Sequence, residues 1–449
     1  MLNHIRKSHN GDIPISSKTS LITPEEDAAL EFDANNDNTR YHVIFSTDCS
    51  AYQHWQSYLV YYTAMQVKQT GHVTRIASGC KDGEAKAMQS WFDTQVQFMS
   101  KRFHLHLTPH FSGIKNEKGE TIGDYKFFNK PFGLKHWLEH SPELNFGSKQ
   151  TGFPEDAKND VVILIDPDMA ILRPLTGDFS NERETVIGKG RKAHQLATKV
   201  GPGKPFAQVY GYGYQWSSNI DLVKLAGPDS PAVKAKREAG FMHYPAGPPY
   251  LAVVSDMYKI ANKWTEFVPG VYEQYPHLLA EMFAYSIAAA DQELPHQLID
   301  SLMISKEDAG GEGWPLIDKI PEEQVCEFAA DRSTAEWALP GVVHACQRYA
   351  VGKDWFFTKR KIPSDIYDCE TPLWDEPPMD LAVHYDFKEP PNGVKTPFKP
   401  KMAARNAFMI CYLYRILNEA ATFYKQNACI PGGANLKKIR NLVQLMAKK

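Results

Sequence analysis

Two aspartates separated by a single proline follow an apolar run in the middle of the chain. Residues 161–165 read VVILI and lead directly into Asp166, Pro167 and Asp168. A run of branched aliphatic residues predicts a buried strand, so both carboxylates are expected at one strand end. Such hard oxygen ligands bind a divalent cation, which can neutralise the charge that builds up on a departing diphosphate. The alternative interpretation is an Asp-Pro-Asp surface turn, which is common at strand ends.

A histidine further along the chain is the candidate for a third ligand. His344 follows Val342 and Val343, so an apolar strand would deliver its imidazole. Imidazole beside carboxylates favours Mn²⁺, with Mg²⁺ as the second choice. A histidine after an apolar run is more often a structural residue, and only contact with Asp166 and Asp168 would establish a metal site.

Two further acidic residues are candidate catalytic groups. Glu281 lies on an apolar helical stretch, where its carboxylate could line a cleft and steady an oxocarbenium-like centre or a sugar hydroxyl. The alternative role of Glu281 is stabilisation of the helix dipole. Asp291, just after the same stretch, is a candidate for a contact with a sugar hydroxyl.

A third group of residues is predicted to bind a nucleotide-linked donor. Ser46, Thr47 and Asp48 end the first predicted strand, and ligands collect at the carboxyl ends of strands in α/β sheets. Lys130 precedes a predicted helix, whose N-terminus would suit phosphate, although a solvated surface lysine is the commoner case. Gln208 is included as the start of an aromatic and glycine-rich run that ends at Trp216. This run could shape an acceptor groove, and it could equally be a glycine-softened packing loop.

The elements that must position these residues alternate between strand and helix. Hydrophobic periodicity predicts strands over residues 41–45, 73–77, 103–107 and 161–165, and helices over 51–69, 84–101 and 131–140. This alternation predicts an α/β fold with a layered sheet. Further helices are predicted over 251–267 and 276–290.

The chain is expected to divide into four parts. Residues 1–38 are polar and predict a flexible leader, and residues 39–370 form the α/β domain. Residues 371–401 are rich in proline and charge and predict a connecting arm. Residues 402–449 predict a helical extension, with a long amphipathic helix over 402–426.

Composition excludes several classes of protein. The net charge of −3, with both signs mixed along 449 residues, argues against a nucleic-acid-binding protein. No apolar run approaches the roughly 20 residues of a membrane span, and the basic start shows no signal peptide. Either the protein is cytosolic, or this chain has lost, or never had, a targeting segment. The seven cysteines include no C-x-x-C pair, so a structural zinc site is not expected.

An ordered set of motifs resembles the plant and algal peptidyl glycosyltransferases of the secretory pathway. That family comprises the peptidyl serine α-galactosyltransferases and the related hydroxyproline O-arabinosyltransferases. The matching stretches, in order, are residues 46–49 (STDC), 52–56 (YQHWQ), 74–80 (TRIASGC), 129–131 (NKP), 164–169 (LIDPDM), 172–175 (LRPL), 281–285 (EMFAY), His344, 351–352 (VG) and 367–369 (YDC).

The resemblance implies a GT-A-like, Rossmann-like fold and a UDP-sugar donor. It implies Mn²⁺ held by Asp166, Asp168 and His344, and retaining transfer of galactose or arabinose. The implied acceptor is a serine or hydroxyproline hydroxyl of a hydroxyproline-rich glycoprotein. A Cys49–Cys80 disulfide and a location in the Golgi or endoplasmic reticulum lumen are also implied, although relatives carry an anchor or signal sequence that this chain does not show.

Two other functions stay open. A catalytically inactive, glycan-binding relative would keep the fold without turnover. A glycoside hydrolase would use Glu281 and Asp291 without a metal, with carboxyl groups about 5–10 Å apart.

Overall fold

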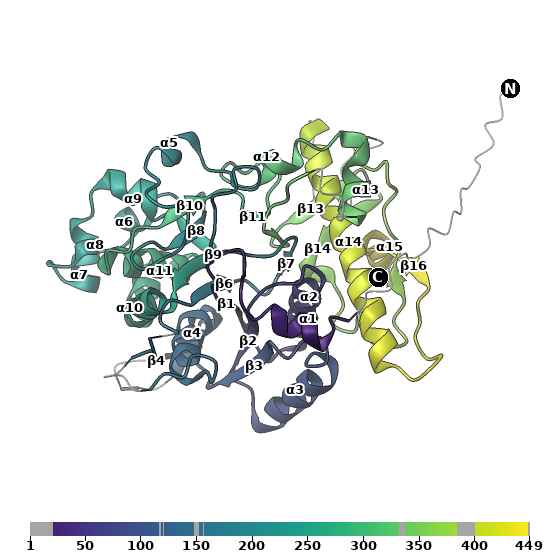
Figure 1. Ribbon diagram of the computed structural model, residues 1–449, viewed down its shortest axis with the longest axis horizontal. Helices are drawn as coiled ribbons and strands as arrows, with labels where there is room; N and C mark the ends of the chain where they lie inside the picture. Colours follow the sequence, from purple (N-terminus) through teal and green to yellow (C-terminus); the bar gives the residue numbers. More distant parts are fainter. Residues whose placement is uncertain are drawn as a thin grey trace.

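A seven-stranded mixed sheet forms the centre of the molecule (Figure 1). The computed structural model describes residues 21–115, 118–119, 121–147, 152–155, 157–331, 337–383 and 400–447. The strand order is β10-β8-β9-β6-β1-β2-β3. These strands are β1 (Tyr41–Asp48), β2 (His72–Ser78), β3 (Phe103–Thr108), β6 (Val161–Ile165), β8 (Phe206–Val209), β9 (Ala246–Val253) and β10 (Gln297–Ile299). Only β9 runs antiparallel to its neighbours in this sheet.

The parallel strands bring the candidate donor and metal residues to one edge. β1 pairs with β6 so that Phe45 lies opposite Ile165. Ser46 and Asp166 therefore both follow the last paired residues at the same carboxyl edge. The predicted strands over 41–45, 73–77, 103–107 and 161–165 are confirmed.

Helices cover both faces of the sheet because alternate strand residues point to opposite sides. Ile163 and Ile165 belong to one core, with α2 (Ala51–Gln66) and α14 (Pro400–Ala428). Val162 and Leu164 belong to the other core, with α4 (Asn129–His140), α10 (Val254–Gln274) and α11 (Ala280–Asp291). The predicted α/β fold, a mixed sheet flanked by helices with a C-terminal helical extension, is confirmed.

A small second sheet carries the candidate histidine back to the main sheet. Its order is β11-β12-β7, made of β11 (Met303–Ile304), β12 (Val342–His344) and β7 (Met169–Ile171). β12 pairs antiparallel with β7, which places His344 opposite Met169. Since Met169 directly follows Asp168, this pairing brings the histidine to the acidic turn across nearly half of the chain.

The C-terminal helix α14 is fastened to the rest of the fold. It packs on α13 (Val325–Ala330), β13 (Arg348–Val351) and β14 (Trp355–Thr358), as Figure 1 shows at the yellow-green end of the chain. The Cys326–Cys411 disulfide joins α13 to this helix, and the Cys369–Cys429 disulfide joins Cys369 to the residue directly after it. The Cys49–Cys80 disulfide, which the family resemblance implied, is confirmed, and Cys346 is the remaining free thiol.

The predicted flexible leader is wrong for its second half. Residues 24–29 form helix α1 (Pro24–Ala29), and the buried carboxylate of Asp27 accepts hydrogen bonds from Ser100 Oγ (2.5 Å) and Arg102 Nε (3.1 Å). A buried ion pair with well-placed hydrogen bonds therefore ties residues 21–38 to the domain. Residues 1–20 lie outside the described part.

The predicted arm over 371–401 also carries ordered structure at its start. Strand β15 (Leu373–Trp374) pairs with β16 (Lys438–Arg440), while residues 384–399 lie outside the described part. Among the described residues, no helix combines the length and apolar character needed to cross a membrane.

Candidate metal centre

Asp166, Asp168 and His344 converge at the end of β6. Their ligand atoms all lie within 4.8 Å of one another. His344 Nε2 is 3.3 Å from Asp168 Oδ1 and 3.8 Å from Asp166 Oδ2. The backbone fixes this arrangement, because Ala345 N donates to Asp168 O at 3.0 Å. The contact that the sequence required for a metal site is therefore present.

Each aspartate turns its other oxygen to a lysine. Lys130 Nζ is 2.8 Å from Asp166 Oδ1, and Lys359 Nζ forms an ion pair with Asp168 Oδ2. Asp166 Oδ2 and Asp168 Oδ1 are thus the inner oxygens, which face the histidine. The centre is a set of two carboxylates and one imidazole, flanked by two ammonium groups.

Electrostatics keep the aspartate of this centre ionised. Burial opposes the charge on Asp168, but His344 and Lys359 outweigh it and lower the pKa of its carboxyl. Burial alone would also lower the pKa of the Lys130 ammonium, but Asp166 and Glu281 raise it. Both groups therefore carry charge at neutral pH, Asp168 as a carboxylate that can ligate a cation and Lys130 as the counter-charge of Asp166 and Glu281.

Lys130 occupies a different place from the one predicted. The 3₁₀ helix η1 (Lys126–Phe128) runs directly into α4, so Asn129 N already donates to Lys126 O. The ammonium of Lys130 instead bridges Asp166 and Glu281. Phosphate binding by Lys130 stays a prediction, and in this structure its ammonium is already paired with two carboxylates.

Glu281 joins the centre through Lys130. Its Oε2 is 3.3 Å from Lys130 Nζ, and its side chain is 3% exposed. Its Oε1 is buried and has no hydrogen-bond partner among the described residues. Burial raises the pKa of Glu281 to about 7, although Lys130 opposes that shift.

Asp291 is not brought to the centre. It lies at the other end of α11, ten residues after Glu281, which corresponds to about 15 Å along a helix. Its carboxylate accepts a hydrogen bond from Ser230 Oγ at 2.5 Å and lies 4.0 Å from Lys263 Nζ. The separation also exceeds the spacing that a two-carboxylate hydrolase built on Glu281 and Asp291 would need.

Ser46, Thr47 and Asp48 lie at the predicted edge, but two of them have local partners. Thr47 Oγ1 donates to Ile76 O (3.2 Å) and accepts from Arg75 Nε (2.9 Å). Asp48 Oδ1 accepts from Ser50 N at 2.8 Å, ahead of helix α2. These contacts shape the end of β1 beside the acidic turn.

Gln208 lies on β8, two strands from β6. Tyr250 of β9 pairs with both Leu164 and Ala207, so the carboxyl ends of β6 and β8 share an edge. Gln208 Nε2 donates to Gly311 O at 2.7 Å, while its buried Oε1 has no partner among the described residues.

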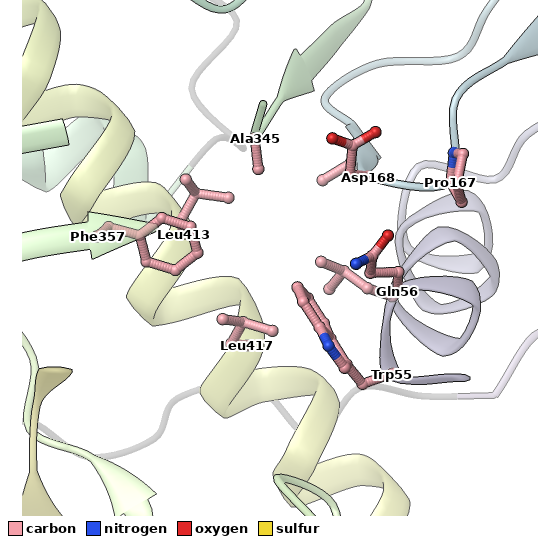
Figure 2. Close-up of a pocket in the computed structure, with 10 residues that line it drawn as sticks. Trp55, Gln56, Pro167, Asp168, Ala345, Phe357, Leu413 and Leu417 are labelled. Carbon is pink, nitrogen blue, oxygen red and sulfur yellow. The ribbon is translucent and has the colours of Figure 1, made fainter. Parts of the chain in front are cut away.

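Lys359 and the surrounding pocket were not predicted from the sequence. Lys359 follows β14 and begins the basic run 359–361, which was the available signal. The pocket encloses about 280 Å³, part of it open to solvent. Figure 2 shows it between α2, the acidic turn and α14, and its lining includes Trp55, Gln56, Asp168, Phe357, Leu413 and Leu417. The C-terminal helix therefore reaches the metal centre.

Comparisons with known proteins support the resemblance in part. No family model matches the chain. The peptidyl serine α-galactosyltransferase of Arabidopsis thaliana is 25% identical over 361 residues, which cover 77% of this chain and 34% of that protein. The chain thus spans about a third of the length of that relative.

Solved glycosyltransferases show weak overall similarity. The bifunctional glycosyltransferase WbbM, in its apo form, matches with a TM-score of 0.35 and 8% identity over 70% of this chain and 47% of that chain. The galactosyltransferase LgtC, solved with donor and acceptor sugar analogues, matches with a TM-score of 0.34 and 10% identity over 68% of this chain and 87% of that chain.

Proposed function

We propose that this chain is a metal-dependent glycosyltransferase with a GT-A-like fold that uses a UDP-sugar donor. The observation that carries the proposal is the convergence of Asp166, Asp168 and His344 between two lysines. The similarity to a peptidyl serine α-galactosyltransferase supports galactose as the sugar, with arabinose as the alternative. The acceptor is then a serine or hydroxyproline hydroxyl of a glycoprotein.

The three ligand residues fit Mn²⁺, or Mg²⁺ in its place. Ligands about 2.2 Å from one ion lie up to about 4.4 Å apart, and the two His344–aspartate separations of 3.3 and 3.8 Å fall within that range. Two hard oxygens and one imidazole are a common donor set for Mn²⁺. When bound, the ion supplies charge neutralisation for the leaving nucleoside diphosphate.

Other residues of this chain bind the diphosphate, the nucleotide and the sugar of the donor. Lys359 lies beside Asp168 with a side chain that is 23% exposed, so it can exchange the carboxylate for a phosphate oxygen of the donor. The end of β1, at Ser46 to Asp48, receives the nucleotide, and Glu281 faces the sugar. Retention at the anomeric carbon follows if the acceptor hydroxyl attacks from the face that the diphosphate leaves.

The three disulfides support a location in an oxidising compartment. Two of them hold α14 and the residue directly after it, and one joins the segments that follow β1 and β2. Disulfides persist in secretory compartments and are rare in the cytosol. The Golgi or endoplasmic reticulum lumen is therefore the proposed compartment.

Replacing Asp168 tests the proposed function directly. Asp168→Ala removes one inner oxygen, so we expect hydrolysis and transfer of UDP-galactose to fall by about 10³-fold or more. Asp229→Ala is a matched control, because the side chain of Asp229 is 99% exposed. Activity would be measured as UDP release with and without Mn²⁺, and folding by circular dichroism.

Each result of this test has a meaning. Full activity after chelation of the metal would contradict the proposal. A folded wild-type protein that binds UDP-sugar and Mn²⁺ without turnover would identify an inactive, glycan-binding relative instead.

A further inference from the structure

A buried chain of charges runs from the metal centre to helix α11. Asp166 presents Oδ2 to His344 and Oδ1 to Lys130, at 3.8 and 2.8 Å. Lys130 Nζ then reaches Glu281 Oε2 at 3.3 Å. The side chains of Lys130 and Glu281 are 12% and 3% exposed. Three elements, the end of β6, the start of α4 and the start of α11, therefore meet through one ammonium group.

In this row of charged side chains, the single ammonium of Lys130 is shared by the carboxylates of Asp166 and Glu281. Burial of a second carboxylate with half a counter-charge is unfavourable unless further hydrogen bonds satisfy it. The nearby donors are committed elsewhere: Trp264 Nε1 donates to the backbone oxygen of Glu281, and Tyr125 OH donates to the carbonyl of His277. Glu281 Oε1 is left as an acceptor without a donor among the described residues.

A second unpartnered group lies close to Glu281. Tyr285, one helical turn after Glu281, stacks on Tyr250 with ring centroids 3.8 Å apart. Tyr250 also packs edge-on against Trp264, whose indole binds the Glu281 backbone. The buried Tyr250 hydroxyl has no partner in the described part of the chain. A carboxylate oxygen that needs a donor and a phenol that can donate together suit a ligand hydroxyl, which does both.

We infer that Lys130 is a positioning residue that couples the metal centre to recognition of the transferred sugar. It holds the outer oxygen of Asp166, and it holds Glu281 so that Oε1 accepts a hydrogen bond from a sugar hydroxyl. Tyr250 is the partner that donates to a hydroxyl of the same sugar. This inference rests on the proposed function, because it takes the ligand to be the sugar of a nucleotide donor bound at the metal.

The difference between UDP and UDP-galactose isolates the role of Lys130. Isothermal titration with Mn²⁺ present would give the dissociation constant of each for the wild type and for Lys130→Met, Lys130→Arg and Glu281→Gln. A hydrogen bond to a charged group is worth about ten-fold or more in affinity. We expect Lys130→Met and Glu281→Gln to weaken the binding of UDP-galactose about ten-fold and the binding of UDP less than about three-fold. Lys130→Arg should recover part of the affinity for UDP-galactose.

Lys135→Met is the matched control on the same helix. Lys135 pairs with Glu139, one turn away and outside the charge chain, so we expect both ligands to bind this variant as they bind the wild type. Mn²⁺ binding without nucleotide would be measured in parallel.

Three results would overturn the inference. Equal weakening of UDP and UDP-galactose in Lys130→Met would assign Lys130 to the diphosphate. Unchanged binding of both would leave it a purely structural role. If Lys130→Met does not fold, Glu281→Gln still decides, because unchanged UDP-galactose affinity there removes the sugar contact. A wild type that binds neither nucleotide would contradict the proposed function itself.

Discussion

The candidate metal centre has two halves, the Asp166–Lys130 pair and the Asp168–Lys359 pair. Their contacts are arranged alike, but their lysines differ in exposure and in the number of carboxylate partners. Asp166 and Asp168 each turn one oxygen to His344 and the other to a lysine. Lys130 is the more buried of the two lysines, at 12% exposed, and has Glu281 as a second carboxylate partner. Lys359 is 23% exposed and follows a short edge hairpin.

Because of this difference, one lysine of the centre can stay fixed while the other exchanges its carboxylate partner for a ligand. An ammonium between two buried carboxylates cannot leave without uncovering both charges, which would cost several kcal/mol. Moving the ammonium of the more exposed Lys359 away from its carboxylate costs much less free energy, because water and a ligand phosphate can replace that partner. Under the proposed function, the Lys130 half orients the sugar and the Lys359 half receives the diphosphate.

The largest expected effect that separates the halves is on turnover. Lys359→Ala should lower the turnover of UDP-galactose by about 10²-fold, because a preorganised cation is lost from the developing diphosphate charge. The free energy of unfolding should fall less than in Lys130→Met, since Lys359 is 23% exposed with one carboxylate partner and Lys130 is 12% exposed with two. Steady-state kinetics and urea unfolding would check both.

Lys361→Ala in the same basic run serves as the control, because Lys361 is exposed. A loss of stability in Lys359→Ala as large as that in Lys130→Met would erase the distinction between the two halves.

The next prediction concerns how the free energy of unfolding depends on pH through Glu281, in the Lys130 half. Burial raises the pKa of Glu281 to about 7 from an ordinary value of 4.5. The folded protein then holds a proton that the unfolded chain releases, so stability from this group is complete below about pH 4.5 and is lost as the pH rises to about 7. The loss is on the order of 3 kcal/mol.

Urea unfolding of the wild type and Glu281→Gln at several pH values would measure this loss. Glutamine does not titrate, so the variant should gain stability relative to the wild type between about pH 4.5 and 7. A constant difference between the two proteins across that range would show that Lys130 fully compensates the buried charge.

A smaller effect, on the KM for UDP-galactose, is expected at Tyr52 near Lys359. Tyr52 lies in the first turn of α2 with an exposed ring, and burial raises the pKa of its phenol while Lys359 opposes the shift. Tyr52→Phe removes one hydroxyl from the exchangeable half, so we expect the KM for UDP-galactose to rise about two- to five-fold with kcat unchanged. A fall in kcat without a change in KM would place Tyr52 with the reacting groups instead.

Four strands of the main sheet and the three candidate metal ligands could be predicted from local sequence. The apolar run 161–165 fixes β6, and the carboxylates that follow it must lie at its end. His344 also follows an apolar strand, which is a local signal. Its approach to Asp168, however, depends on the pairing of β12 with β7, and only the order of motifs across the chain suggested it.

The partners of these residues could not be predicted, because they depend on distant packing. Lys359 and Asp168 are separated by 191 positions, and no periodic pattern relates them. Asp291 shares a helix with Glu281, but the helix length carries it away from the centre. Residues 251–253 were predicted as helix because an apolar run has the same composition in a buried strand; they end β9, and α10 begins at Val254.

Helix α14 limits how far the protein could be shortened. A fragment that stops near residue 370 would keep every ligand residue of the metal centre. It would nevertheless leave Trp55, Leu59 and Phe357 without the wall that Leu413 and Leu417 provide, and would break two disulfides. The smallest unit that keeps this pocket and both disulfides therefore extends through α14 to Cys429, and a fusion partner would have to be joined beyond that residue.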